Sequence, residues 1–185
     1  MILNWLRTTQ FYLKTTLVRE PMAHAVSKVL QVIGDEHNVR TYFNEPFMSR
    51  CMKLANDYLG ELFDWFDCEL RAAFGIDIFE YPFNRERGYS VTKQGNISIL
   101  VMRLENLYNL ECVIGSFVGV SNFKLENANE ANQKLYKYLY DDVRKAIKIP
   151  RSLVDSLYKG NQKMDHFYTK EEKENFLKKW EANII

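Results

Sequence analysis

The feature that most constrains the fold of this chain is an almost continuously apolar run, ISILVM, at residues 97–102. Such a run, rich in β-branched residues, is typical of a strand that is buried on both faces, as in a parallel sheet. A sheet of that kind needs helices to cover its faces. The run therefore predicts an α/β domain with a mostly parallel sheet and flanking helices.

Helical patterns occur on both sides of this run. Apolar residues recur at the spacing of one helix face over 58–74 and again over 136–147. A short helix is expected over 152–159. Thr169 and Glu172 have the spacing of a capping box, which predicts that the last helix begins there. The C-terminal part of the chain is therefore expected to be helical.

Shorter patterns fill the middle of the chain. Residues 76–81, IDIFEY, predict a short strand. Residues 83–96 contain Gly88 and Gly95, which favours a loop or a hairpin before the apolar run. A turn and a short helix are expected to follow the run, over 103–120.

A second strand and its following helix are predicted near the start. Residues 11–18 are aromatic and β-branched, and Pro21 suits the first turn of a helix expected over 21–33. This order delivers Arg19 to the carboxyl end of a strand, where open α/β sheets bind ligands. The helix would offer free N–H groups and a positive dipole end, with Ser27 two turns along. Spacing alone also fits a plain strand-to-helix corner with a surface arginine.

Composition narrows the class of protein. The chain has 185 residues, which favours one domain, and its net charge of +1 argues against a globally basic nucleic-acid binder. Three scattered cysteines and three scattered histidines match neither a disulfide framework nor a metal site. No apolar run reaches the ~20 residues of a membrane span, and no signal peptide is evident. These features predict a cytoplasmic protein with reduced thiols and no metal.

Several blocks resemble a known family. The segment LVREP followed by Ser27 resembles the 3'-phosphate-binding element of sulfotransferases, whose pattern is Arg, Pro, a second Arg and then Ser. From about residue 13 to 181, consecutive blocks such as FDWFDCELRAAFGIDIFEYPFNRERGYSV, ISILVMRLENL and FKLENANEANQKLYKYLYDDVRKAIKIP resemble the capsular polysaccharide synthesis family. That family has an Asn-Lys-Trp-Tyr-Ser signature and is related to P-loop sulfotransferases.

The resemblance implies a bacterial protein that transfers, or once transferred, a sulfuryl group from 3'-phosphoadenosine 5'-phosphosulfate to a glycan hydroxyl. Arg19 and Ser27 match the positions that bind the 3'-phosphate of this cofactor. His24 stands where the family pattern has its second arginine, and a neutral imidazole is the weaker phosphate partner. His24 also fits the exposed side of a helix, which is the simpler interpretation.

Other family positions are only partly retained. The signature is replaced here by residues 133–137, QKLYK, which keep Lys134 and Tyr136. Glu105 lies in a stretch similar to the one after a central sulfotransferase strand, and a structural role is the simpler interpretation for it. His166 is the best remaining group for acid–base chemistry, but it has no evident partner. No catalytic residue can be named.

The family to which the resemblance points has an N-terminal part that is not found before Thr15. The family fold would supply a first strand and a glycine- and serine-rich loop around the 5'-phosphosulfate, whereas residues 1–12 contain no glycine. The expectation is a single sulfotransferase-like P-loop domain over 1–185, N-terminally truncated. Three alternatives stay open: a sulfotransferase, an inactive relative that serves in binding or assembly, or a gene whose start lies upstream. If the upstream neighbour of the first strand is absent, residues 14–18 would lie at a sheet edge and could promote self-association.

Overall fold

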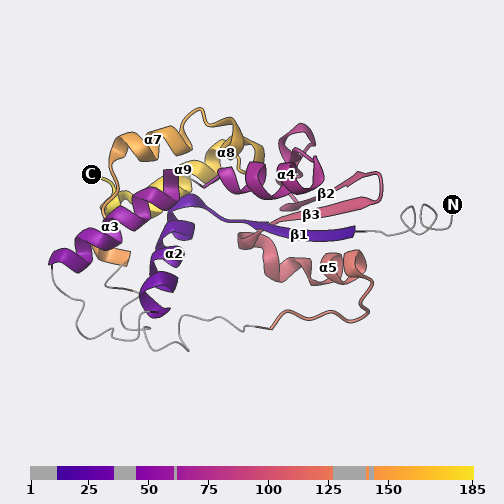
Figure 1. The fold of residues 1–185 in the computed structure, drawn as a ribbon. Helices are drawn as coiled ribbons and strands as arrows, with labels where there is room; N and C mark the ends of the chain where they lie inside the picture. The colour runs from indigo at the N-terminus through magenta and orange to yellow at the C-terminus, as the bar shows by residue number, and fades with distance from the viewer. Residues whose placement is uncertain (1–11, 36–44, 61, 127–140, 142–143) are drawn as a thin grey trace. The chain divides into compact units, whose positions relative to one another are not determined.

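The computed structural model describes residues 12–35, 45–60, 62–126, 141 and 144–185 (Figure 1). These residues group into two compact units, and each unit is built from two separate stretches of chain. Unit 1 comprises Met1–Arg19 and Phe63–Glu126, whereas unit 2 comprises Glu20–Leu62 and Asn127–Ile185. The chain therefore passes from one unit to the other after Arg19, after Leu62 and after Glu126.

Unit 1 contains a three-stranded sheet in the order β1-β3-β2. Strand β1 (Tyr12–Val18) runs parallel to β3 (Ile97–Arg103), whereas β2 (Tyr89–Gln94) runs antiparallel to it. The described residues thus form a mixed sheet and not the mostly parallel one expected. The reason lies at Gly95, which has a φ of 59° in the two-residue turn between β2 and β3. A turn this short can join only antiparallel neighbours.

The prediction that the apolar run forms a strand buried on both faces is confirmed. Ile99 and Leu100 are fully buried at the centre of β3. One face of the strand packs against the 3₁₀-helix η4 (Leu104–Leu110) and helix α5 (Glu111–Val118), which follow it directly. Figure 1 shows α5 on one side of the sheet and α4 (Ala72–Phe74) on the other. The turn and short helix predicted after β3 are therefore confirmed.

Two predictions in unit 1 are wrong. A π-helix, η2 (Phe66–Arg71), precedes α4, so the pattern over 58–74 is not one continuous α-helix. Residues 76–81 contain a 3₁₀-helix, η3 (Ile78–Glu80), in place of a strand. The Asp77 side chain accepts a hydrogen bond from the Phe79 N–H at 2.9 Å. This local bond satisfies a backbone donor that a strand would have offered to a neighbour.

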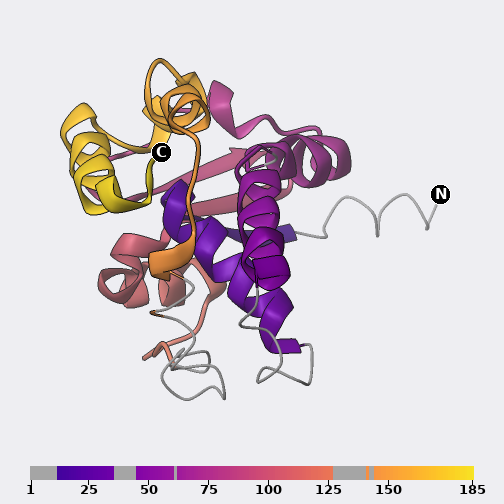
Figure 2. The same ribbon diagram turned by 90° about the vertical axis from the view of Figure 1, so that its left-hand side faces the viewer.

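Unit 2 is helical in its described residues. Its elements are α2 (Pro21–Asp35), α3 (Glu45–Gly60), α7 (Arg151–Tyr158), α8 (Gln162–Phe167), α9 (Lys170–Lys179) and the 3₁₀-helix η6 (Glu181–Asn183). Helices α2 and α3 pack against each other (Figure 2). The predicted end of the first strand at Val18 and the predicted helix start at Pro21 are both confirmed.

The end of the chain is hydrogen-bonded back onto an earlier segment of unit 2. The predicted capping box is present, with the Thr169 side chain accepting from the Glu172 N–H and the Glu172 side chain accepting from the Thr169 N–H. Ile149 and Ile184 form a parallel bridge. The helix predicted over 136–147 lies largely outside the described residues. Within that range, the described residues 141 and 144–146 are helical. No described helix is both long and apolar enough to span a membrane.

Candidate functional site

The predicted phosphate-binding element begins where β1 ends. Val18 is the last residue of β1 and pairs with Arg103, the last residue of β3. Arg19 follows, so its side chain comes from the carboxyl end of the parallel strand pair, as the sequence predicts. Glu20 and Pro21 then lead into α2, and Pro21 occupies the first helical position, where a missing N–H costs nothing.

Glu20 is the central residue of unit 2 at this corner, and its side chain is almost completely buried. Its Oε1 accepts from the Met22 N–H at 3.0 Å and from the Tyr158 hydroxyl. Its Oε2 accepts from the Ala23 N–H at 2.8 Å and from the Trp180 Nε1–H at 3.1 Å. One carboxylate therefore joins the start of α2 to the end of α7 and to the residue after α9.

Burial controls the proton chemistry of this cluster. Loss of water raises the pKa of Glu20 above its ordinary value, although all four hydrogen bonds act in the opposite direction. Burial, together with the neighbouring Glu20 charge, also raises the pKa of Tyr158. The hydroxyl of Tyr158 therefore stays protonated and donates to the carboxylate. The cluster resembles a structural junction more than an acid–base pair open to a substrate.

The same contacts change the expectation for the α2 N-terminus. The first amide donors of a helix are the groups that bind an external phosphate. Here the N–H groups of Met22 and Ala23 already donate to the Glu20 carboxylate, and that of His24 donates to the Glu20 carbonyl at 2.9 Å. The negative charge of Glu20 also offsets the positive end of the helix dipole, which weakens its attraction for an external anion. The free N–H groups expected from the sequence are thus occupied.

Arg19 and Ser27 are both partly exposed. Arg19 is the last residue of the first stretch of unit 1, whereas Ser27 lies on α2 in unit 2. Among the described residues, neither side chain takes part in an ion pair or a hydrogen bond. His24, at the position of the second arginine of the motif, is also partly exposed on α2.

A second arginine at the same edge of the sheet is used internally. Arg103 is 4% exposed, its Nε donates to Asn106 Oδ1 at 2.8 Å and its Nη2 donates to the Arg85 carbonyl at 3.0 Å. Its own N–H donates to the Gly88 carbonyl at 2.8 Å. Arg103 therefore fastens the loop before β2 to the end of β3. Glu105, which follows it, is exposed on η4.

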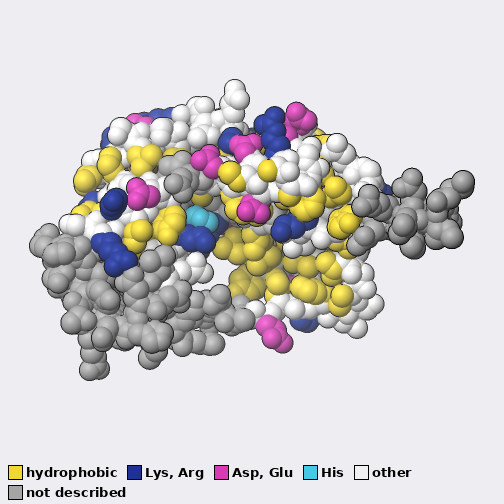
Figure 3. All heavy atoms as spheres, viewed as in Figure 1, with side chains coloured by type: hydrophobic (Ala, Val, Ile, Leu, Met, Phe, Trp, Pro, Cys, Tyr) yellow, Lys and Arg dark blue, Asp and Glu magenta, His cyan; other side chains and the backbone are white. Residues whose placement is uncertain are grey.

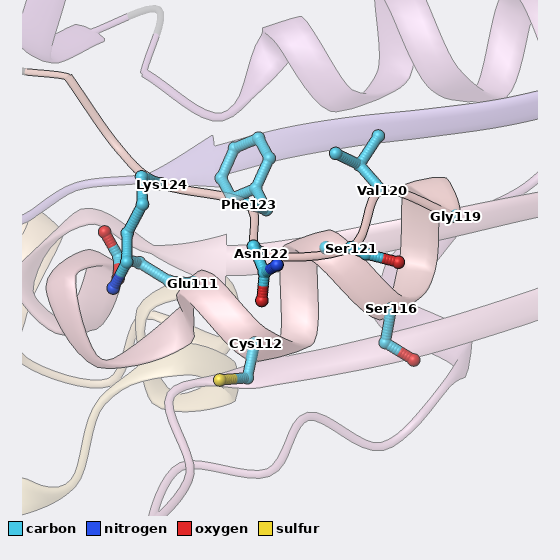
Figure 4. A pocket seen from close by; sticks show the side chains of 10 residues that line it. Glu111, Cys112, Ser116, Gly119, Val120, Ser121, Asn122, Phe123 and Lys124 are labelled. Atoms are coloured by element: carbon cyan, nitrogen blue, oxygen red, sulfur yellow. The ribbon is translucent and has the colours of Figure 1, made fainter.

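A cavity of about 510 Å³ lies within unit 1 between α5 and the segment that follows it (Figure 4). At one end Lys124 Nζ donates to Glu111 Oε2 at 2.7 Å, and the Leu125 N–H donates to Glu111 Oε1 at 2.9 Å. These bonds lower the pKa of Glu111. The other polar groups at the cavity come from Ser116, Ser121 and Asn122, which are neutral. The two charged side chains at the cavity, Glu111 and Lys124, therefore neutralise each other.

The remaining candidates from the sequence are dispersed. Cys51 is buried, which raises its thiol pKa to about 11, whereas Cys68 and Cys112 are exposed. His166 is partly buried on α8 and packs edge-to-face on Phe167 at 4.8 Å. Residues 133–137 lie outside the described part of the chain. Within that part, no group of three or more His, Cys, Asp or Glu side chains could hold a metal ion.

Sequence reasoning missed both Glu20 and Arg103. A carboxylate directly before Pro21 carries the charge that is favourable near the start of a helix. Its partners Tyr158 and Trp180, however, lie 138 and 160 residues further along the chain, so the burial of Glu20 had no local signal.

Comparison with known proteins gives one match. Residues 52–169 match the NKWYS family, described as "Putative capsular polysaccharide synthesis protein". The match spans well over half of the chain. It contains Arg103, the cavity and residues 133–137, whereas Arg19 and Ser27 precede it. No curated protein and no solved structure matches the chain. The chain belongs to this capsular polysaccharide synthesis family.

Proposed function

We propose that this protein is a sulfotransferase-like component of bacterial capsular polysaccharide synthesis. In this proposal, 3'-phosphoadenosine 5'-phosphosulfate is the donor and a glycan hydroxyl is the acceptor. Arg19 and Ser27 bind the 3'-phosphate of the nucleotide. Family membership supports the link to capsular polysaccharide synthesis. The sulfuryl chemistry rests on the similarity of LVREP and Ser27 to the sulfotransferase element.

The observation that carries the proposal is the state of Arg19. It stands at the carboxyl end of a parallel strand, is partly exposed and has no ion pair or side-chain hydrogen bond within the described residues. Arg103, at the end of the neighbouring strand, is buried, and its guanidinium already donates to Asn106 and to the Arg85 carbonyl. Arg19 therefore keeps its forked donor available for an external anion.

The fit to the nucleotide is limited to side chains. The guanidinium of Arg19 can donate two parallel hydrogen bonds to phosphate oxygens, and the hydroxyl of Ser27 can donate one more. The α2 amides do not contribute, because Glu20 holds them. When bound, the phosphosulfate supplies an activated sulfuryl group together with its leaving group.

The occupied helix terminus favours a second candidate, a relative that binds but does not catalyse. Sulfuryl transfer needs donors that stabilise the charge developing on the leaving oxygens, and backbone amides are a common source. With the first α2 amides bonded to Glu20, the described residues supply few such donors at this corner. The protein would then serve as a binding or assembly component of the same process.

Calorimetric titration with adenosine 3',5'-bisphosphate tests the anion site. Arg19→Ala should weaken binding by about tenfold to 150-fold, the loss of one charge-assisted contact worth about 1.5–3 kcal/mol. Arg19→Lys should recover only part of the affinity, because an ammonium lacks the fork. Arg151→Ala, which removes an exposed arginine from α7, is the matched control and should bind like the wild type. Absence of binding, or equal binding by Arg19→Ala, would remove the assignment of Arg19.

Transfer assays separate the two candidates. Incubation with radiolabelled phosphosulfate and capsular glycan should label the glycan if the protein is a transferase, and Arg19→Ala should reduce that labelling. Binding of the bisphosphate without any labelling supports the non-catalytic component.

A further inference from the structure

Within the part of the chain that the structure describes, strand β1 has an open edge. The sheet order β1-β3-β2 leaves β1 hydrogen-bonded on one side only, and no other described strand pairs with it. Exposed apolar strand edges are sites at which other chains add. Leu13 is 53% exposed and Leu17 is 47% exposed, which is unusual for two leucines of one short strand.

The other edge of the sheet is engaged where β2 begins. Asn84 forms an antiparallel bridge with Tyr89, and the Ser90 hydroxyl donates to the Pro82 carbonyl at 3.0 Å. The Asn84 N–H in turn donates to Ser90 Oγ at 2.9 Å. A segment of unit 1 therefore lies beside the start of β2, so the two edges of the sheet are not equivalent.

The exposed leucines lie beside the core of unit 1. Register places Leu17 beside Met102 and Thr15 beside Leu100, so these four side chains share one face of the sheet. Leu100 and Met102 are buried beneath η4 and α5, whereas the leucines of β1 are left half exposed. Val120, beside this face, is also 51% exposed, and its side chain points toward β1 in Figure 4. Figure 3 shows hydrophobic side chains gathered where Figure 1 places β1 and α5.

We propose that a second copy of this chain occupies the open edge, with the two β1 strands antiparallel and a two-fold axis at Thr15. In this register Leu13 of each copy lies opposite Leu17 of the other, on one face. Lys14 lies opposite Thr16, so no like charges face each other directly. The result is a continuous six-stranded sheet with an isologous interface.

Neighbouring registers are less favourable. A two-fold axis at Lys14 sets the two lysines directly opposite each other, which is destabilising. An axis at Thr16 sets Leu13 opposite Arg19 and leaves both leucines without an apolar partner. Of these three axes, only the one at Thr15 pairs leucine with leucine, and it pairs both leucines of β1 at once. This inference does not depend on the proposed function.

Cysteine cross-linking tests the register. In a background with Cys68→Ser and Cys112→Ser, Thr15→Cys should form a covalent dimer under a mild oxidant such as diamide. The two Cβ atoms would lie about 4.5–5.5 Å apart across the axis, close to disulfide geometry. Lys14→Cys is the matched control, because its copies are diagonal neighbours about 7–8 Å apart and should cross-link far more slowly. Equal cross-linking of both variants, or none by Thr15→Cys, would overturn the register.

Light scattering after size-exclusion chromatography tests the association itself. The wild-type protein should have the mass of a dimer, with dissociation on dilution. Leu17→Lys should be a monomer, since it places an ammonium against Leu13 of the other copy. The circular dichroism spectrum of this variant should be unchanged, because the substituted side chain is half exposed. A wild-type monomer at every concentration, or a Leu17→Lys dimer, would refute the proposal.

Discussion

At the scale of single residues, Glu20 combines two properties that seldom occur together. It is a buried carboxylate with every acceptor site in use, and it is also the cap of a helix. Neutral glutamic acid can still accept at both oxygens, whereas the amide of glutamine replaces one acceptor with a donor. We therefore expect Glu20→Gln to lower the free energy of unfolding by about 1–3 kcal/mol at acidic pH. Urea denaturation measures the change.

The pH dependence of that change has a definite sign. Because the pKa of Glu20 is raised in the folded protein, its contribution to stability is fully present below its ordinary value of 4.5 and is lost as the pH rises through the folded value. The difference between wild type and Glu20→Gln should therefore be largest near pH 4 and shrink at higher pH. Glu174→Gln, at an exposed site on α9, should show almost no difference. A deficit that grows with pH would mean that the pKa is lowered.

At the scale of elements, two turn glycines allow a paired experiment. Gly88 and Gly95 both have positive φ, 73° and 59°. A Cβ at Gly95 would meet nothing, whereas one at Gly88 would lie 2.4 Å from the Asn106 side chain. Gly95→Ala should cost about 1 kcal/mol of stability, from backbone strain alone. Gly88→Ala should cost about 1–3 kcal/mol more, since displacing Asn106 leaves the buried Arg103 Nε without a partner.

Thermal unfolding of both alanine variants measures these costs. Equal destabilisation would show that Asn106 moves without penalty and that its bond to Arg103 contributes little.

Helix α9 gives a prediction about its start. The Thr169 hydroxyl accepts from the Glu172 N–H at 3.2 Å, and removing a cap of this kind costs about 1 kcal/mol. Thr169→Ala should therefore be less stable than wild type by about that amount in urea denaturation. Thr169→Ser keeps the hydroxyl and should lose only a small part of the stability. If the serine variant is as unstable as the alanine variant, the hydroxyl is not the source.

How far the elements could be predicted depends on how local their signals are. Strand β3, the start of α2 and the α9 capping box have strong local signals, and all three are confirmed. The strand predicted over 76–81 is wrong because the Asp77 side chain bonds the Phe79 N–H and favours a 3₁₀-helix over 78–80. This local bond outweighs the β-propensity of isoleucine and phenylalanine. For the candidate site, the position of Arg19 could be predicted from the strand ahead of it. The burial of Glu20 at the α2 terminus could not, because it depends on Tyr158 and Trp180.

At the scale of the whole molecule, both units depend on joining distant stretches of chain. Asn183 shows this for unit 2: its buried Nδ2 donates to the Arg144 carbonyl at 2.6 Å and to the Ile147 carbonyl at 2.8 Å. Asn183→Asp sets a carboxylate against two carbonyl oxygens and should cost more than Asn183→Ala, by about 1–3 kcal/mol at neutral pH. Denaturation at neutral and at acidic pH should reveal a deficit that shrinks when the aspartate is protonated. A constant deficit would contradict this account.

The bond between Glu20 and Trp180 also has a consequence for the timing of biosynthesis. The two residues are separated by 160 positions, so Glu20 leaves the ribosome long before the indole that completes its shell exists. Until Trp180 has been synthesised and has left the ribosome, the carboxylate must keep water in its place, and the start of α2 cannot reach its final, dry environment. The junction at the start of α2 is therefore complete only after residue 180 has left the ribosome.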